Sequence, residues 1–146
     1  MSQSTQSRGT CAFCGREMTR SGMSRHLMAC PERQAAIDAS RGGPGQAQPL
    51  YHVQVQDADD GTFWLHLEMN GWAQLADLDS YLRAIWLECC GHMSMFSWKR
   101  WDGSEIPMRS RAQKLFQKGM ELTHVYDFGT ESVTRVRVVD VRRGRP

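Results

Sequence analysis

Four residues near the start of the chain restrict its fold more than any other feature. Cys11 and Cys14 are separated by two residues, eleven residues precede His26, and three more precede Cys30. A two-residue gap lets one tight turn place both thiolates on the same ion, and a three-residue gap places two ligands on one helix face. Gly15 follows Cys14, where such a turn needs an unusual backbone angle. The pattern C-x2-C-x11-H-x3-C therefore predicts one structural Zn²⁺ bound by Cys11, Cys14, His26 and Cys30.

The apolar residues between these ligands agree with a metal-dependent head. Met18 and Met23 are placed much as in the Cys2His2 ββα zinc finger, which the segment resembles, with one residue fewer between them. Cys30 replaces the last histidine. Methionine is a soft core filler, and structural zinc contributes about 10–16 kcal/mol to such small units. Scattered core cysteines predict no spacing, and a redox Cys-x-x-Cys pair lacks its βαβ context, so both alternatives explain less.

Three arginines accompany the ligands: Arg16, Arg20 and Arg25. They can offset the negative charge of three thiolates on Zn²⁺, and they are candidate nucleic-acid contacts. By analogy with the ββα finger, base-reading positions would fall near Thr19, Gly22 and Arg25, and Gly22 has no side chain for reading a base. One finger covers only about 3 base pairs. We therefore do not expect sequence-specific DNA binding by the head alone, and contact with phosphates, RNA or a protein surface stays open.

Composition excludes several classes of protein. The 146 residues are 40% apolar and 23% charged, with a net charge of +2, which suits one modest domain plus an appendage. Such a charge excludes a binder that works by bulk positive charge alone. No apolar run reaches the ~18 residues that span a bilayer. Residues 1–10 lack the apolar stretch of a secretory signal. We therefore expect a cytoplasmic protein with reduced thiols and no membrane association.

Charge and glycine content divide the chain into parts. Residues 1–49 carry a net charge of +3, residues 51–90 carry −6, and residues 99–118 carry +4, which hints at a charged partner for one end. Residues 41–49 hold three glycines and two prolines without apolar periodicity, and predict a flexible linker. The expected organisation is a zinc finger head over residues 1–33, a helix end and linker over 34–49, and a body over 50–146.

The body predicts an α+β fold. Apolar residues alternate with polar ones over residues 51–56 and 62–69, across a turn containing Gly61, which indicates a hairpin. The period then changes to that of a helix, with apolar residues at positions 75, 78, 82, 85 and 89. Residues 93–98, 122–128 and 132–141 predict strands, and 110–118 a short helix. We expect a small mixed sheet with one main helix and a short helix, preceded by the zinc finger.

A second group of metal-ligating residues follows the main helix. Cys89, Cys90 and His92 could hold another metal, with His66 or His124 as a further ligand. The alternative is that Cys89 belongs to the core, Cys90 is a small half-buried residue and His92 is a polar loop side chain. Only three candidates are local, and adjacent cysteines rarely point the same way, so the pattern favours the alternative.

Most of the body resembles a known family. The segments are Phe-Trp-Leu-His-Leu at 63–67, Leu-Ala-Asp-Leu-Asp at 75–79, Ile-Trp-Leu-Glu-Cys-Cys-Gly-His-Met-Ser-Met-Phe at 85–96, and Tyr-Asp-Phe-Gly at 126–129. Together they are similar to the Ri-plasmid open-reading-frame-three-like family of plasmids, mobile elements and bacterial chromosomes. The resemblance covers roughly residues 50–141 and implies the same α+β fold. Some members also carry a short N-terminal zinc head.

The same resemblance implies no secure activity. His92 and Asp127 are the polar positions that match the family. Many members continue after Tyr-Asp-Phe-Gly with Asp, Trp and His, whereas this chain has Thr-Glu-Ser-Val at 130–133. The resemblance therefore supports the fold more than a site built from those residues.

These observations favour a zinc-binding, non-enzymatic binding module. In this interpretation Arg16, Arg20 and Arg25 contact nucleic-acid phosphates, and the body supplies a second contact. One alternative is a protein–protein adaptor that uses the finger and the body. Another is a metal-dependent enzyme with a site around His92 and Asp127, which would need a second metal or a pocket where these side chains converge.

Overall fold

The computed structural model describes residues 8–41, 47–58, 64–85, 94–98, 105–126 and 132–144. Its N-terminal part is a ββα unit with an additional helix. Strands β1 (Arg8–Thr10) and β2 (Glu17–Thr19) form an antiparallel hairpin, followed by α1 (Arg20–Ala29) and α2 (Pro31–Ser40). Pro31 begins a second ten-residue helix directly after Cys30, and this helix runs past residue 33 into the segment expected to hold a helix end and linker.

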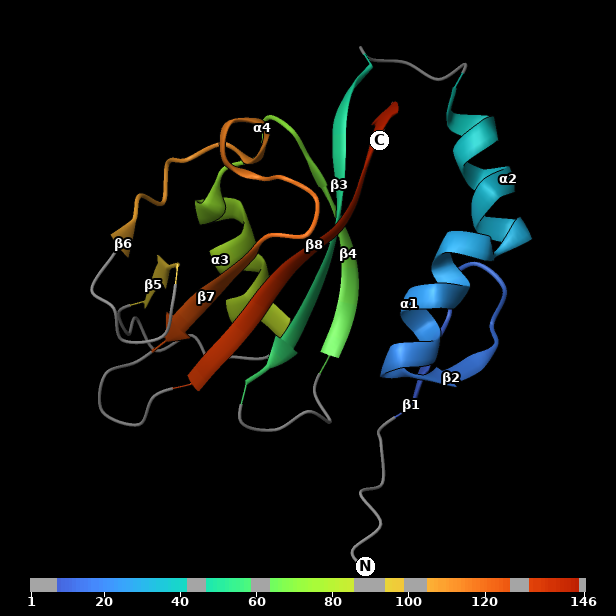
Figure 1. Ribbon diagram of the computed structural model, residues 1–146, viewed down its shortest axis with the longest axis horizontal. Helices are drawn as coiled ribbons and strands as arrows, with labels where there is room; N and C mark the ends of the chain where they lie inside the picture. Colours follow the sequence, from blue (N-terminus) through green and yellow to red (C-terminus); the bar gives the residue numbers. More distant parts are fainter. Residues whose placement is uncertain are drawn as a thin grey trace, which may run out of the picture.

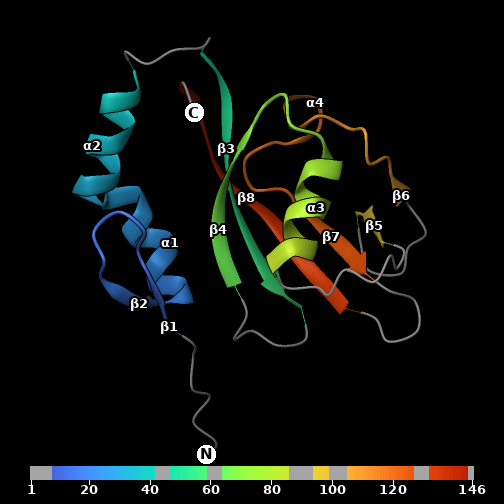
Figure 2. The ribbon, with the colours of Figure 1, turned by 180° about the vertical axis from the view of Figure 1, so that it is seen from behind.

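The body is one antiparallel sheet with helices on one side. Its strands lie in the order β4-β3-β8-β7-β5-β6. They are β3 (Gln48–Asp57), β4 (Trp64–Asn70), β5 (Ser94–Ser97), β6 (Glu105–Ile106), β7 (Glu121–Tyr126) and β8 (Ser132–Gly144). Helix α3 (Leu75–Ile85) connects β4 to β5, and the short α4 (Ala112–Leu115) precedes β7. Figures 1 and 2 show the sheet from opposite sides, with α3 against one of its faces.

The main core lies between α3 and this sheet. Of the predicted stripe, Leu75, Leu78 and Leu82 are buried, whereas Ile85 at the end of α3 is 40% exposed and position 89 lies outside the described residues. The sheet supplies the facing side chains, among them Val53, Val55, Phe96, Leu122, Val136 and Val138. Because side chains alternate along a strand, the residues between these positions point to the opposite face. That opposite face carries His52 and Gln54 on β3, and His66 and Glu68 on β4.

The α+β class is confirmed, and three details differ from expectation. Every strand pairing described is antiparallel, so the sheet is not mixed; periodicity fixes which face a side chain occupies but not strand direction. Gln48 and Pro49, expected in the linker, begin β3 and pair with Gly144 and Arg143. Between the strand predicted over residues 93–98 and the helix predicted over 110–118 the structure adds β6, whose two residues are too few to give a period.

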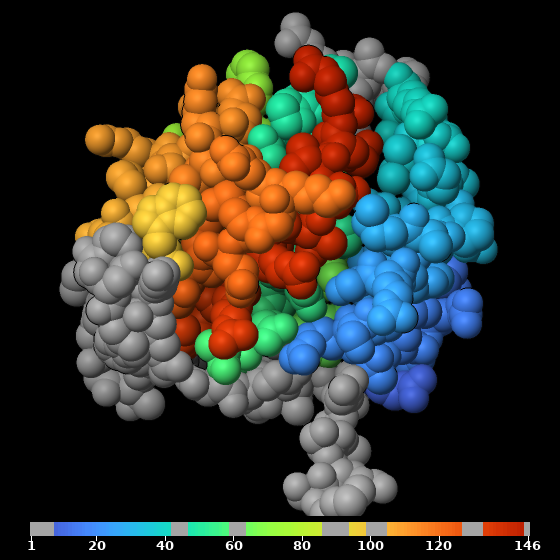
Figure 3. All heavy atoms as spheres, in the orientation of Figure 1, coloured from blue at the N-terminus to red at the C-terminus, as the bar shows by residue number. Residues whose placement is uncertain are grey.

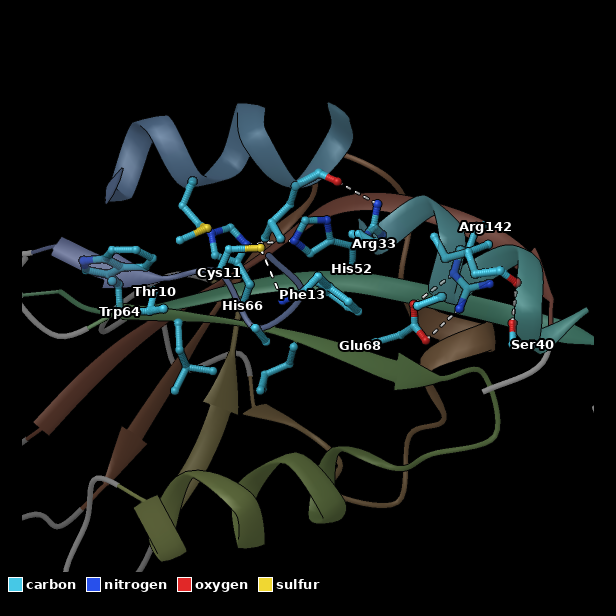
Figure 4. A pocket seen from close by; sticks show the side chains of 18 residues that line it. Thr10, Cys11, Phe13, Arg33, Ser40, His52, Trp64, His66, Glu68 and Arg142 are labelled. Carbon is cyan, nitrogen blue, oxygen red and sulfur yellow. Dashed lines mark hydrogen bonds and ion pairs between the residues drawn. The ribbon is translucent and has the colours of Figure 1, made fainter. Parts of the chain in front are cut away.

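The finger packs against the sheet face that α3 leaves open. Figure 4 shows β3 and β4 between α1 on one side and α3 on the other. Trp64 of β4 packs against the buried cluster of Cys11, Met23, Leu27 and Cys30 in the finger. Of the expected linker, residues 42–46 lie outside the described residues. Within the described ranges, no helix combines the length and apolar character that crossing a membrane requires.

Candidate metal centre and basic groove

The β1–β2 hairpin presents the first two sulfur ligands. The amide of Cys11 donates to the carbonyl of Arg16 (2.9 Å), and the amide of Gly15 donates to the carbonyl of Cys11 (2.9 Å). Gly15 has φ of 79°, the left-handed conformation that the sequence predicted there. The amide of Phe13 points at the Cys11 Sγ atom (3.4 Å). This tight turn brings Cys11 and Cys14 to one side of the hairpin.

Helix α1 presents the other two ligands. Thr19 caps its N-terminus, where the Thr19 hydroxyl accepts a hydrogen bond from the amide of Gly22 (3.3 Å). His26 lies in its last turn, and Cys30 is the residue that ends it. Because Thr19 is engaged in capping and Gly22 has no side chain, two of the three base-reading positions offer little to a DNA base.

The four predicted ligands converge. The ligand atoms of Cys11, Cys14, His26 and Cys30 all lie within 4.8 Å of one another. The Cys14 Sγ atom is 3.2 Å from Nε2 of His26, and the Cys11 and Cys30 Sγ atoms are 4.0 Å apart. Cys11 and Cys30 are buried, and the other two ligands are half-buried. This arrangement could hold a metal ion, which confirms that the sequence spacing brings the four side chains together.

Hydrogen bonding prepares one of the buried thiols for deprotonation. Burial alone would raise the pKa of Cys11, but the amides of Cys14 and Phe13 and the side chain of His26 outweigh burial and lower this pKa to about 7. Burial raises the pKa of Cys30, and its neighbouring cysteine side chains add to the rise. Metal ligation requires thiolates, so binding at this centre is coupled to proton release.

Two histidines occupy the interface between finger and sheet. Nε2 of His52 and Nδ1 of His66 are 2.7 Å apart, from neighbouring strands β3 and β4. Their outer nitrogens, Nδ1 of His52 and Nε2 of His66, are buried with no hydrogen-bond partner in the described chain. Both side chains line a cavity of about 500 Å³ between the finger and the sheet (Figure 4). Burial lowers both pKa values to about 4, helped by the charge of nearby Arg33.

A second concavity separates α1 from the sheet, and we call it the basic groove. It has a volume of about 510 Å³ and is lined by Arg20, Ser21, Ser24, Arg25, Gln54, Gln56, Glu121, Arg135 and Arg137. In the space-filling view the blue helix α1 lies beside the red strand β8, with a hollow between them (Figure 3). Of the three arginines singled out in the sequence, Arg20 and Arg25 line this groove. Arg16 is exposed and is not among the lining residues.

Sequence reasoning missed the contribution of the sheet to this groove. Arg135 and Arg137 are exposed on β8, two residues apart and therefore on one face. The alternation of Val136 and Val138 with these arginines was the available signal. What it could not reveal was that the finger docks on that face, because no local pattern reports which distant segment covers a sheet.

The other histidine considered as a metal ligand lies elsewhere. His124 is completely buried on β7, and its Nε2 is 2.7 Å from Oδ1 of Asp79 on α3. Ser94 donates to the same oxygen (2.7 Å), and Arg83 pairs with the other (3.1 Å). Burial would raise the pKa of Asp79, but the hydrogen bonds from His124 and Ser94 lower it overall.

His124 and His66 therefore lie on opposite faces of the sheet and cannot share a metal with each other. Cys89, Cys90, His92 and Asp127, the residues of the proposed second metal and of the enzyme alternative, lie outside the described residues. Within the described ranges, Cys11, Cys14, His26 and Cys30 are the one group of three or more His, Cys, Asp or Glu side chains close enough to hold a metal.

Comparison with solved structures supports the fold. No family model and no curated protein matches the sequence. Among solved structures, the chain is similar to a protein of unknown function from Methanosarcina mazei Go1, with a TM-score of 0.56 and 15% sequence identity. The match covers 67% of this chain and 63% of that one. At this identity the likeness concerns the fold alone, and the chain spans less than two thirds of that protein.

Proposed function

We propose that this protein is a zinc-binding, non-enzymatic module that contacts nucleic acid through its finger, with the sheet as a second contact. The observation that carries the proposal is the pairing of a Cys3His cluster with unneutralised arginines on the same helix. Arg20 and Arg25 form no ion pair or hydrogen bond through their side chains with the described part of the chain. They lie within two turns of His26, so the metal centre fixes the helix that presents them.

The donor set favours zinc among the common metals. Three thiolates and an imidazole are soft to borderline ligands, and a closed set of four suits tetrahedral Zn²⁺ in a structural role. Such a centre carries a charge of about −1, because three thiolates outweigh the ion.

The resemblance of the body to the Ri-plasmid open-reading-frame-three-like family stays a proposal as well. A protein partner for the finger remains the alternative, and salt dependence separates the two.

Metal analysis tests the first half of the proposal. We expect one zinc per chain in the wild type and in Cys90→Ser, and none in Cys14→Ser, measured by mass spectrometry of the purified proteins. Cys90→Ser is the matched control, since it removes a cysteine that the finger does not use. A wild-type chain without zinc, or a zinc count that falls in Cys90→Ser, would contradict the assignment.

Salt-dependent binding tests the second half. Fluorescence anisotropy with labelled oligonucleotides should show affinity that falls steeply between about 50 and 200 mM salt, because phosphate contacts release counterions. Arg20→Ala/Arg25→Ala should weaken binding about tenfold and reduce the logarithmic salt slope by about 1.4–1.8. Arg109→Ala/Lys114→Ala removes the same charge from exposed positions outside the groove and should have little effect. Equal losses in the two double variants, or affinity insensitive to salt, would favour a protein partner.

A further inference from the structure

The basic groove combines residues from two separate parts of the chain. Across the sheet, Gln54 of β3, Arg137 of β8 and Glu121 of β7 form one row in register. Gln56 and Arg135 form part of the next row. Helix α1 forms the opposite wall with its first two turns. Finger and sheet therefore contribute two arginines each to one concavity.

The charge of this groove is not balanced within the described chain. Four guanidinium groups line it together with the single carboxylate of Glu121. None of the four arginine side chains forms a hydrogen bond or ion pair with any residue that the structure describes. Glu121 is directly opposite Arg137 on the neighbouring strand and yet forms no ion pair with it in the described ranges. Gathering positive charge in a concavity raises the local concentration of anions.

The chemistry of the lining residues also indicates what kind of anion fits the groove. The neutral members are two serines and two glutamines, which donate and accept hydrogen bonds, and Gln54 at the floor is buried. No aromatic or aliphatic side chain is among the lining residues, so the groove offers no surface on which a base can stack. A volume of about 510 Å³ between a helix and a sheet suits a single extended chain rather than a duplex.

We propose that this groove binds the phosphodiester backbone of single-stranded nucleic acid without discriminating between bases. The proposal rests on the proposed function and adds the form of nucleic acid, the mode of recognition and the role of Arg135 and Arg137. In this arrangement neither the finger nor the sheet holds a complete site, because each supplies half of the positive charge. Glu121 limits affinity at one end of the groove.

Oligonucleotide binding by the full-length, zinc-loaded protein tests this. Single strands of about 12 nucleotides, within the range of known single-strand sites, are compared as oligo-dT, oligo-dA and a duplex. We expect the two single strands to bind within about threefold of each other and at least about tenfold more tightly than the duplex. With four phosphates contacted, the logarithmic salt slope should be near −3. Arg135→Ala/Arg137→Ala should roughly halve that slope, and Arg109→Ala/Lys114→Ala should leave it unchanged.

Glu121→Gln is expected to increase affinity, a result that damage to the fold would not produce. Because the substitution removes the single negative charge of the groove at nearly constant size, single-strand affinity should rise about two- to fivefold at low salt and converge with the wild type at high salt. Lower affinity in Glu121→Gln, or a duplex preferred over the single strands, would overturn the proposal. So would inorganic polyphosphate that binds more tightly than the oligonucleotides.

The outcomes separate this proposal from the one before it. If Arg20→Ala/Arg25→Ala weakens binding and Arg135→Ala/Arg137→Ala does not, the finger contacts nucleic acid and the proposal that the groove binds a single strand is wrong. If no oligonucleotide binds the zinc-loaded wild type, both proposals fail.

Discussion

At the scale of single residues, His52 and His66 are buried polar side chains that oppose packing at the finger–sheet interface. Each is held in its neutral form by burial, and each leaves one nitrogen without a partner in the described chain. A buried polar atom without a partner costs about 1–3 kcal/mol. The pair therefore opposes the docking that Trp64 and the apolar finger residues favour.

Acid should weaken the fold through these two histidines. Their pKa values are about 4 in the folded chain and near 6.5 when unfolded, so the unfolded chain binds more protons between these values. Stability should therefore fall as the pH drops from about 6.5 to about 4, by on the order of 3 kcal/mol per histidine. Urea unfolding of the wild type at several pH values measures this loss.

The matched variant is His52→Leu/His66→Leu. Acid also releases metal from the finger, but that effect is common to both proteins, so the difference between them isolates the histidines. The variant should lose less stability on acidification, and replacing both partners by apolar groups should not cost stability at pH 7. Identical acid profiles would show that the histidine pair is not the cause.

The metal ligands were predictable and the histidine pair was not, for a physical reason. Cys11, Cys14, His26 and Cys30 lie within twenty residues, and their geometry follows from a turn and a helix, which local spacing specifies. The alternation over β3 and β4 did place His52 and His66 on polar faces of a hairpin. Their contact depended on a pairing register, and their burial on docking of the finger, and neither is a local property.

At the scale of elements, α3 is fixed to two strands through one carboxylate. Asp79 accepts hydrogen bonds from His124 of β7 and Ser94 of β5, so a single helix residue joins elements far apart in sequence. Asp77, two residues earlier, instead accepts from the amide of Gln74 (2.9 Å) at the helix start. Asp77 therefore caps the start of α3, whereas Asp79 joins α3 to the sheet.

Removing Asp79 should be much more costly than removing Asp77. Asp79→Ala leaves His124 and Ser94 without their acceptor in a buried setting, and should cost about 3–5 kcal/mol. Asp77→Ala removes one capping hydrogen bond and should cost about 1 kcal/mol. Chemical denaturation of the two variants measures both, and equal costs would contradict a linking role for Asp79.

Docking of the finger on the sheet depends on a close approach at Gly9. A Cβ atom on Gly9 would lie 2.7 Å from Cη2 of Trp64, nearer than real Cβ atoms come. Gly9→Ala should therefore shift the finger against the sheet at a cost of about 1–3 kcal/mol, while the metal ligands stay together. Zinc content should remain at one per chain, and affinity for single strands should fall several-fold because the groove changes width.

Trp64→Phe should rescue that variant. Phenylalanine lacks the atom that the new methyl group meets, so Gly9→Ala/Trp64→Phe should recover affinity relative to Gly9→Ala. A loss of zinc from Gly9→Ala would instead place its defect inside the finger.

Element types followed from the sequence better than their arrangement. The stripe from Leu75 to Leu82 gave α3, and the alternating runs gave β3 and β4, because each buries one regular face. Strand β8 extends three residues beyond the expected end. Its last two residues, Arg143 and Gly144, pair with Pro49 and Gln48, which the sequence places in the linker. The order of the strands could not be read from any of these patterns.

At the scale of the whole molecule, the finger and the sheet differ in the size of their apolar cores, and both line the basic groove. The sheet and α3 have an extensive apolar core, whereas the finger has Met23 and Leu27 beside two buried cysteines. A core of that size is insufficient for independent folding, so we expect the finger to require a bound metal ion to fold. The groove therefore exists only while the finger is folded.

Zinc removal should unfold the finger and leave the sheet folded. After chelation, amide hydrogen exchange should become fast in α1 and α2 and stay slow in β3, β7 and β8. Single-strand affinity should drop about tenfold or more, because half of the groove arginines are no longer held in place. Adding zinc back should restore the wild type but not Cys14→Ser. Loss of protection throughout the sheet would show that the two units unfold together.

The position of β8 has a consequence for synthesis on the ribosome. This strand is the last described element along the chain, yet it lies between β3 and β7 and supplies a partner to each. Until its residues leave the exit tunnel, the β3–β4 hairpin and the β7 side of the sheet have no strand to join them. Nascent chains in which β8 has not yet emerged should therefore carry two unpaired strand edges, a state that favours aggregation unless chaperones cover it.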